Sequence, residues 1–275
     1  MFTIQPLVQG AALTAFKRLW INIAVCTFIG NRAVDEGSVI FTTGSSFHTA
    51  NSSFSNNSAD YNGGVIFSEK DSFHIADSTF TAPLGGVIYS KASFFHIADS
   101  LFSNTYIGGV ITSDTSSFNI FNSAFSNNSA DNGGVIYSDG SSFHAADSTF
   151  KSNSAIFGGA IHSVGGSFYV SDCTFRDNRA STDGGVIVAS SRSSLHIADS
   201  SFTYNSVGIY NSSTMLERTL GYCCNNIFSL QQSSINISGT TSFVKNVGSQ
   251  VYAATSNVTF SGFTRFENCG NMNVS

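Results

Sequence analysis

The stretch NGGVIYSDGSSFHAADSTF, residues 132–150, recurs along the chain with few changes. Close copies are NGGVIFSEKDSFHIADSTF at 62–80, LGGVIYSKASFFHIADSLF at 84–102 and DGGVIVASSRSSLHIADSSF at 183–202. Self-similarity at a fixed period of roughly 20 to 50 residues is the sequence signature of a repeat protein. We therefore expect one structural unit to be repeated along most of the 275 residues.

The spacing of the glycine doublet predicts the shape of that unit. Its first residue falls at Gly37, where the doublet is degenerate, and then at Gly63, Gly85, Gly108, Gly133, Gly158 and Gly184. Successive steps are 26, 22, 23, 25, 25 and 26 residues, too short for a strand–helix–strand crossover, which needs about 30. Within each unit a core aromatic residue or Leu195 follows the first glycine by 10 or 11 residues, and a Phe follows 7 later. Only the return to the next doublet varies, from 5 to 9 residues.

These lengths predict an all-β fold: a single right-handed parallel β-helix of about ten coils, with three short strands per coil. Each strand would pair with its counterpart in the next coil, about 4.8 Å along the axis. The handedness follows from parallel crossovers, which are right-handed in about 98% of cases. Residues 1–19 are predicted to form an N-terminal cap segment, and residues 20–275 the β-helix domain, with an insertion around 206–232.

Matching positions of successive coils would then stack into columns. The strongest prediction for the core is a column of isoleucines: Ile40, Ile66, Ile88, Ile111, Ile136, Ile161 and Ile187. Two more inner columns are aromatic, one from Phe47 to Leu195 and one from Phe54 to Phe202. Because their seven-residue spacing is odd, a bend must separate them, and the intervening Ala-Asp-Ser-Thr suits one. A column of Asn, each three residues after a second Phe, is predicted to stack in the third bend: Asn31, Asn57, Asn128, Asn153, Asn178 and Asn205.

Charge and composition exclude some classes of function and partner. A formal net charge of −5 with only 12 dispersed Lys and Arg leaves no basic stripe for phosphates, so nucleic acid is not expected as a partner. No apolar run is long enough for a transmembrane helix. The first twenty residues do not have the pattern of a secretory signal peptide. Five Cys show no metal-ligand spacing, and the disulfide state of Cys223, Cys224 and Cys269 stays open. No cofactor is expected, and the oligomeric state is not predicted.

Two short motifs carry a family resemblance. GGVI occurs at five doublets and GGAI at Gly158, while FSNN, FSNN, FKSN, FRDN and FTYN follow the second strand. In these motifs the chain resembles the chlamydial polymorphic outer membrane proteins, whose passenger regions carry repeated GGA(I/L/V) and FxxN, within the pectin lyase-like superfamily of right-handed β-helices. The resemblance covers roughly residues 20–270. It implies an extracellular or cell-surface adhesin with the same fold.

The best candidate binding surface is an aromatic stripe one residue after the inner Ile column. This position varies while its neighbour does not, which is typical of an outward-facing residue, and exposed aromatic residues on a flat sheet suit contact with a glycan or protein. Ordinary strand propensity explains the same residues without a ligand. The candidate residues are Phe41, Phe67, Tyr89, Tyr137, His162 and Tyr210.

Two polar columns are weaker candidates. His74 and His96 should be neighbours on an outward face, where such a pair could hold a transition metal or respond to pH, although repeat ancestry explains the column equally. A column of Asp and Asn, including Asp77 and Asp99, could hold Ca²⁺, but a turn role accounts for it.

Three functions remain in competition. The leading hypothesis is a non-catalytic surface or secreted β-helix scaffold that binds a glycan or a host or cell-surface protein through a lateral face. The alternative from another class is a polysaccharide lyase or glycoside hydrolase, which would need a singular constellation of carboxylates that the repeats do not show. A truncated repeat fragment without independent function is the third.

Overall fold

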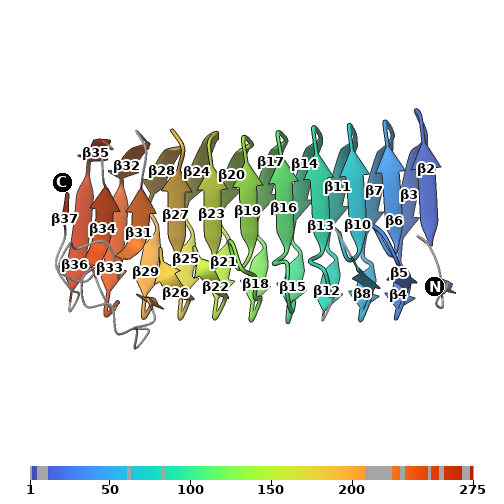
Figure 1. The fold of residues 1–275 in the computed structure, drawn as a ribbon, viewed down its shortest axis with the longest axis horizontal. Helices are drawn as coiled ribbons and strands as arrows, with labels where there is room; N and C mark the ends of the chain where they lie inside the picture. The colour runs from blue at the N-terminus through green and yellow to red at the C-terminus, as the bar shows by residue number, and fades with distance from the viewer. Residues whose placement is uncertain are drawn as a thin grey trace.

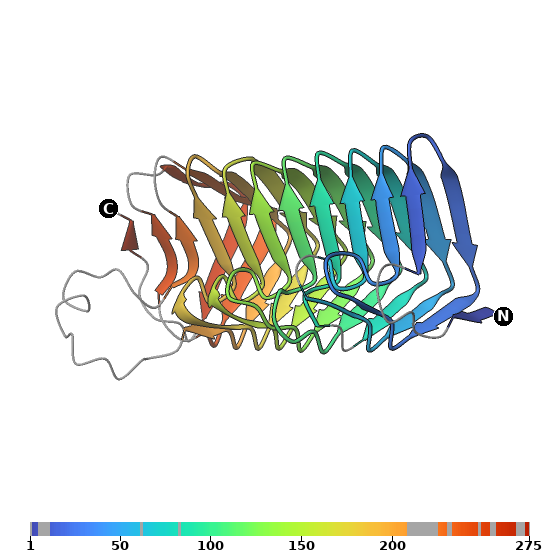
Figure 2. The same cartoon turned by 45° about the vertical axis from the view of Figure 1, so that its right-hand side comes forward.

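The structure is a computed structural model that describes residues 2–4, 12–60, 63–81, 84–207, 225–229, 233–246, 249–253, 257–267 and 273–274. These residues form a right-handed parallel β-helix with three strands per coil, as predicted (Figure 1). The turned view in Figure 2 shows successive coils stacked along one axis, with the first and last strands at opposite ends. Each coil contributes one strand to each of three long sheets, named A, B and C below, and the chain passes from sheet B to sheet C, then to sheet A, and back to sheet B.

Three long parallel sheets contain most of the strands. Sheet A is ordered β1 (Phe2–Ile4), β4 (Cys26–Ile29), β8 (Ser53–Ser55), β12 (Thr79–Thr81), β15 (Leu101–Ser103), β18 (Ala124–Ser126), β21 (Thr149–Lys151), β25 (Thr174–Arg176), β29 (Ser201–Thr203), β33 (Thr240–Val244) and β36 (Phe263–Glu267). Sheet B is ordered β2 (Leu13–Phe16), β6 (Ile40–Thr43), β10 (Ile66–Glu69), β13 (Ile88–Lys91), β16 (Ile111–Asp114), β19 (Ile136–Asp139), β23 (Ile161–Val164), β27 (Ile187–Ser190), β31 (Asn225–Ser229), β34 (Ser249–Ala253) and β37 (Asn273–Val274).

Sheet C is ordered β3 (Trp20–Ala24), β7 (Ser46–Ala50), β11 (Ser72–Ala76), β14 (Phe94–Ala98), β17 (Ser117–Phe121), β20 (Ser142–Ala146), β24 (Ser167–Ser171), β28 (Ser194–Ala198), β32 (Ser234–Ser238) and β35 (Asn257–Phe260). Two small sheets lie on the return from sheet A to sheet B. One pairs β5 (Arg32–Ala33) with β9 (Ser58–Ala59), and the other is ordered β22 (Ser154–Phe157), β26 (Arg179–Asp183) and β30 (Ser206–Val207).

The predicted inner columns are confirmed. Ile66 pairs in register with Ile88, and Ile88 with Ile111, and all three side chains are buried. In sheet A the rings of adjacent coils stack nearly parallel, as Phe54 and Phe80 do at 4.4 Å between centroids and 2° between planes. Offset stacks of this kind add to the free energy gained by burial, so the aromatic columns stabilise coil against coil.

The bend between sheets C and A is built as the Asp-Ser motif predicts. Its Asp or Asn adopts the left-handed conformation in every coil from Asn51 to Asp199, as Asp77 does with φ 47° and Asp147 with φ 51°. Asn and Asp tolerate this conformation better than other residues with a side chain. The Ser that follows was not predicted to matter, yet Ser100 is buried, accepts a hydrogen bond from the Ser78 amide (3.2 Å) and donates to the Ala98 carbonyl (2.7 Å).

The predicted Asn stack lines the return from sheet A. Asn153 is buried, and both its amide nitrogen and its Nδ2 donate to Oδ1 of Asn178, at 3.1 and 3.0 Å. Its Nδ2 also donates to the Phe125 carbonyl at 3.1 Å. Because buried polar groups are costly when unpaired, this column fixes the path of the return while satisfying backbone groups.

The N-terminal boundary differs from the prediction. Within the segment 1–19, expected to be a cap, β1 and β2 are the outermost strands of sheets A and B and pair with β4 and β6. Ala15 is buried while Thr14 and Phe16 are exposed, so this segment has the alternation of a strand. The β-helix therefore begins before residue 20.

Other predictions fall partly outside the described residues. The insertion predicted around 206–232 lies mostly on 208–224 and 230–232, which are not described. Cys26 and Cys173 are free thiols at positions that serine occupies in other coils, whereas Cys223, Cys224 and Cys269 lie outside the described residues. The described part of the chain contains no helix capable of spanning a membrane.

Candidate functional site

The aromatic stripe lies on the outer face of sheet B. Phe41 pairs in register with Phe67, and Phe67 with Tyr89, while Tyr137 pairs with His162 two coils further on. Thr112 separates these two groups, and Val188 follows His162. The last predicted member, Tyr210, lies outside the described residues. The described candidates thus form two clusters along one face.

The stripe is less exposed than the sequence suggested. Phe67 is only 7% exposed, and Phe41, Tyr89, Tyr137 and His162 are half-buried. The cause is the doublet corner of the preceding coil, which lies against the stripe: a Cβ on Gly63 would stand 3.2 Å from the Tyr89 Cβ. The glycines therefore allow the return to approach the rings closely, and a partner would reach only their outer edges.

The two clusters have different ring geometries. Phe41 and Phe67 stack at 4.8 Å and 6°, and Phe67 and Tyr89 at 5.3 Å and 9°. Tyr137 and His162 instead meet edge to face at 5.5 Å, with Phe157 6.2 Å from the imidazole. Nδ1 of His162 lies 3.1 Å from Oδ1 of Asn132. The first cluster offers a flat apolar strip, and the second adds polar atoms.

Burial sets the ionisation of the polar rings. It raises the pKa of Tyr89, helped by the carboxylates of Asp114, Glu36 and Glu69. It raises the pKa of Tyr137 in the same way, with Asp139 and Asp114 as the neighbouring charges. At neutral pH these phenols are protonated and can donate hydrogen bonds.

The imidazole of the second cluster is also uncharged at neutral pH. Burial lowers the pKa of His162 to about 4. The rings of the stripe therefore carry no charge. Glu69, Asp114 and Asp139 stand beside them at the strand ends, with Lys91 between the first two, so the rim is negative on balance. The stripe can hold a partner by ring contact and hydrogen bonding.

Three exposed apolar residues on the return from sheet A to sheet B were missed by the sequence reasoning. They are Leu84, Tyr106 and Ile107, and Ile107 is 74% exposed with φ 65°, a conformation that β-branched residues rarely adopt. They lie on the two shortest returns, between the small sheets β5–β9 and β22–β26–β30. The sequence signal that could have identified them is the short length of the returns after Phe80 and Phe102, 5 and 6 residues.

The His column lies on the outer face of sheet C. The rings of His48, His74 and His96 stand edge to face, with centroids 4.9 Å apart at both steps. Nε2 of His74 is covered and has no hydrogen-bond partner among the described residues. Burial lowers the pKa of His74, and the neighbouring His96 and His48 lower it further. His74 and His96 are thus neighbours as predicted, but no group of three His, Cys, Asp or Glu in the described segments is arranged to hold a metal ion.

The Asp column serves the bend. Asp77 and Asp99 occupy left-handed positions, and Nδ2 of Asn122 donates to Oδ1 of Asp99 at 2.6 Å. Asp199 accepts a hydrogen bond from the Thr240 amide at 2.7 Å. These roles explain the column as turn chemistry.

Fold and repeat together define the class of this protein, a parallel β-helix repeat protein. Residues 51–69, 122–139 and 172–190 match the family model described as the Chlamydia polymorphic membrane protein repeat, so the chain carries this repeat three times. Each matched segment runs from the left-handed Asn or Asp of the bend to the last residue of the next sheet B strand. The predicted resemblance to the chlamydial polymorphic membrane proteins is confirmed for these three segments. No curated protein and no solved structure matches the chain.

Proposed function

We propose that this protein is a non-catalytic, surface-exposed β-helix that binds a glycan or a protein of another cell through the aromatic stripe of sheet B. The observation that carries the proposal is the register of the stripe. Rings of successive coils are held 4.8 and 5.3 Å apart on an outward face. The matched repeat, named for a membrane protein, supports a place at the cell surface.

A scaffold role fits the carboxylates better than a polysaccharide lyase or hydrolase does. The Asp and Asn of the bend are explained by left-handed turns, and the same position recurs from coil to coil. Acid–base catalysis on a glycan needs two carboxyl groups with different environments at one place. A repeated turn residue supplies the same environment many times.

The test replaces Tyr89 and Tyr137 together with Ser and measures binding to a glycan array and to cultured cells. We expect binding to fall roughly tenfold, since aromatic anchors dominate such interfaces. The control is Tyr169→Ser, which removes an exposed ring from sheet C instead.

The same protein is assayed against uronate polymers. Turnover abolished by a single Asp substitution would overturn the proposal, as would equal binding by the double variant and the unmodified protein to every glycan and cell type that binds.

A further inference from the structure

A trough on the outer face of sheet C stands apart from the stripe. One column of this face reads Trp20, Ser46, Ser72 and Phe94 in successive coils. Trp20 is 73% exposed and Phe94 51% exposed, and the two serines between them are small. With strands about 4.8 Å apart, the aromatic residues stand about 14 Å from each other. The column therefore places two small polar residues between two exposed aromatic residues, and the depression lies at its Trp20 end.

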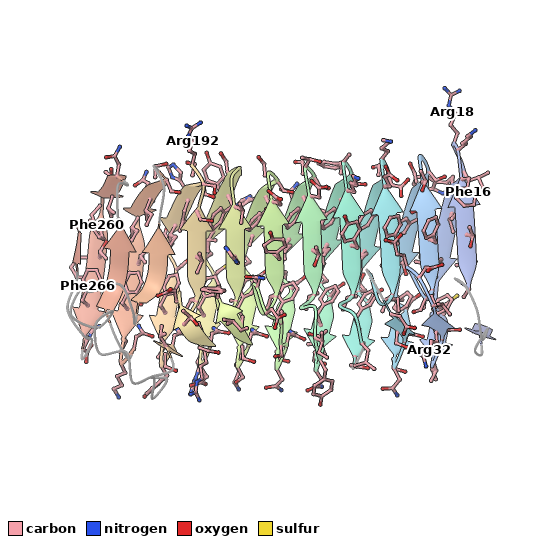
Figure 3. All side chains as sticks on the ribbon, viewed as in Figure 1. Phe16, Arg18, Arg32, Arg192, Phe260 and Phe266 are labelled. Carbon is pink, nitrogen blue, oxygen red and sulfur yellow. The ribbon has the colours of Figure 1, made fainter. Side chains whose placement is uncertain are left out.

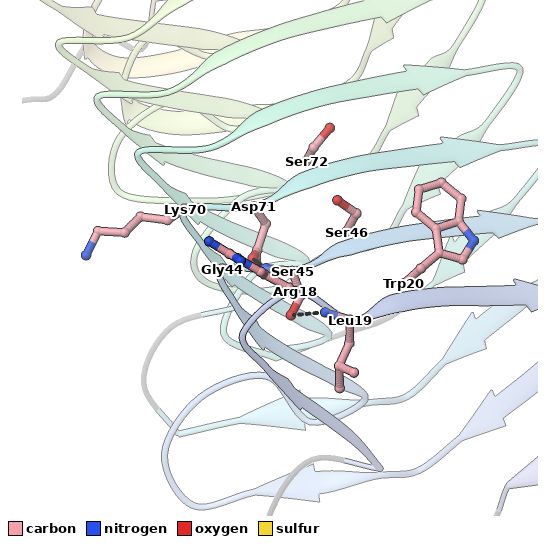
Figure 4. Close-up of a pocket in the computed structure, with 9 residues that line it drawn as sticks. All are labelled: Arg18, Leu19, Trp20, Gly44, Ser45, Ser46, Lys70, Asp71 and Ser72. Carbon is pink, nitrogen blue, oxygen red and sulfur yellow. Dashed lines mark hydrogen bonds between the residues drawn. The ribbon is translucent and has the colours of Figure 1, made fainter.

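Basic residues form the edge of this trough at the corner between sheets B and C. Arg18 and Lys70 line a depression of ≈530 Å³ together with Trp20, Ser46 and Ser72. Figure 4 shows the two serines lying between the indole and the basic side chains. Gly44 lies between Lys17 and Lys70 in the stack, and space is open above it, with the nearest atom to an added Cβ 4.0 Å away. The missing side chain leaves the depression accessible.

The carboxylate at the base of the depression is already engaged. Asp71 is 5% exposed and accepts hydrogen bonds from Oγ1 of Thr42 (2.5 Å), the amide of Ser45 (2.6 Å) and Oγ of Ser68 (2.9 Å). Lys70 contacts Glu69 at 3.2 Å in a surface pair whose lysine side chain is 69% exposed, and such a pair contributes little to stability. Arg18 makes no ion pair with any described residue. Its charge is available to a ligand.

We propose that this trough binds an acidic saccharide, with a sugar ring against Trp20, hydroxyl groups on Ser46 and Ser72, and a carboxylate or sulfate on Arg18 and Lys70. An indole face suits the C–H face of a sugar ring, and serine hydroxyls both donate and accept hydrogen bonds. Arg forms bidentate contacts with planar carboxylates, and similar charge-assisted bonds with sulfate. A neutral saccharide would leave the basic edge unused.

The site differs from the stripe in chemistry and lies on the neighbouring sheet, and the pair of Glu69 and Lys70 stands where the two surfaces adjoin. The stripe has a negative rim and lies on sheet B, whereas the trough has a basic edge and lies on sheet C. Binding of an acidic saccharide should therefore survive the substitution of Tyr89 and Tyr137. Failure of one proposal leaves the other standing.

The experiment measures binding of heparin-derived and polygalacturonate oligosaccharides to the full chain by calorimetry, with dextran oligosaccharides as the neutral comparison. We expect binding of at least one acidic probe, with the two acidic probes distinguishing sulfate from carboxylate recognition. Arg18→Gln and Trp20→Ser should each weaken it roughly tenfold, and added salt should weaken it further.

Arg192→Gln is the matched control. Arg192 has φ 66° against 62° for Arg18, and Figure 3 shows both side chains projecting from the same edge of the solenoid. Circular dichroism and the thermal midpoint check that each variant folds. The proposal is overturned if neither acidic probe binds, if dextran binds as well as they do, or if Arg192→Gln weakens binding as much as Arg18→Gln.

Discussion

At the scale of single residues, Gly133 and Gly140 have the same backbone conformation in different surroundings. Their φ values are 58° and 59°. A Cβ on Gly133 would overlap the Ile136 carbonyl oxygen, whereas on Gly140 its nearest neighbour would be Thr115 Cγ2 at 3.5 Å. We expect Gly140→Ala to cost about 1 kcal/mol of unfolding free energy from conformation alone.

Gly133→Ala should cost several times more, because the backbone of the corner must move to relieve the overlap. Denaturant unfolding of the two variants measures both costs. Equal midpoints would show that the close approach at the doublet contributes nothing to stability.

His162 makes stability depend on pH. Its pKa is lowered from 6.5 to about 4 by burial, so the folded protein favours the neutral imidazole. The stabilisation is complete above pH 6.5 and is lost as the pH falls towards 4, because the unfolded chain takes up the proton first. The loss amounts to at most about 3 kcal/mol.

The measurement compares unfolding free energies at pH 7 and pH 4 for the unmodified protein and His162→Gln. The variant should lose less stability than the unmodified protein over this interval. Identical losses would mean that the imidazole is as well solvated in the folded state as in the unfolded one.

At the scale of strands and corners, the sequence predicted the features that depend on the spacing of the repeat, namely the inner columns and the bend between sheets C and A. The inner columns follow from spacing alone, since equal spacing places Ile66, Ile88 and Ile111 at equivalent positions. The odd seven-residue step required a bend, and its Asp marked the place. The spacing of residues within one repeat was therefore enough to predict the path of one coil.

The exposure of the site did not follow from the pattern. Phe67 alternates as an outward residue, yet the corner of the preceding coil covers it. Trp20 and Arg18 gave no repeating signal, because they lie in the first coil, where the motif is degenerate. The burial of a ring by the return from sheet A to sheet B depends on contacts between coils. The surroundings of residues that do not repeat depend on the same contacts, which the pattern of one coil does not contain.

The aromatic column of sheet A should stabilise its middle more than its end. Phe150 is buried between Phe125 and Phe175, at 5.0 and 4.7 Å. Phe266 is stacked on Phe243 at 5.1 Å but is exposed. We expect Phe150→Ala to cost about 3–5 kcal/mol and Phe266→Ala roughly 1 kcal/mol or less. Urea unfolding checks both, and similar costs would contradict a column whose energy comes from burial.

At the scale of the whole molecule, each strand of the long sheets pairs only with its counterparts in the adjacent coils. Stability in such an array is approximately a sum of unit and nearest-neighbour terms, so opening begins at the ends. We expect amide hydrogen exchange to be slowest in the central strands β16, β19 and β23, and fastest towards β2 and β36. Mass spectrometry of exchanging peptides measures this gradient. Uniform protection would show that the solenoid opens only as a whole.

The register between neighbouring coils also governs how such a chain can change in length. Ile111 and Ile136 hold equivalent positions, so removing residues 110–134 would join Gly109 to Val135 at the same point of the corner. Every remaining side chain would keep its column. A gene encoding this protein could gain or lose one turn at a time by recombination between its own near-identical segments, and the product would differ in reach rather than in fold.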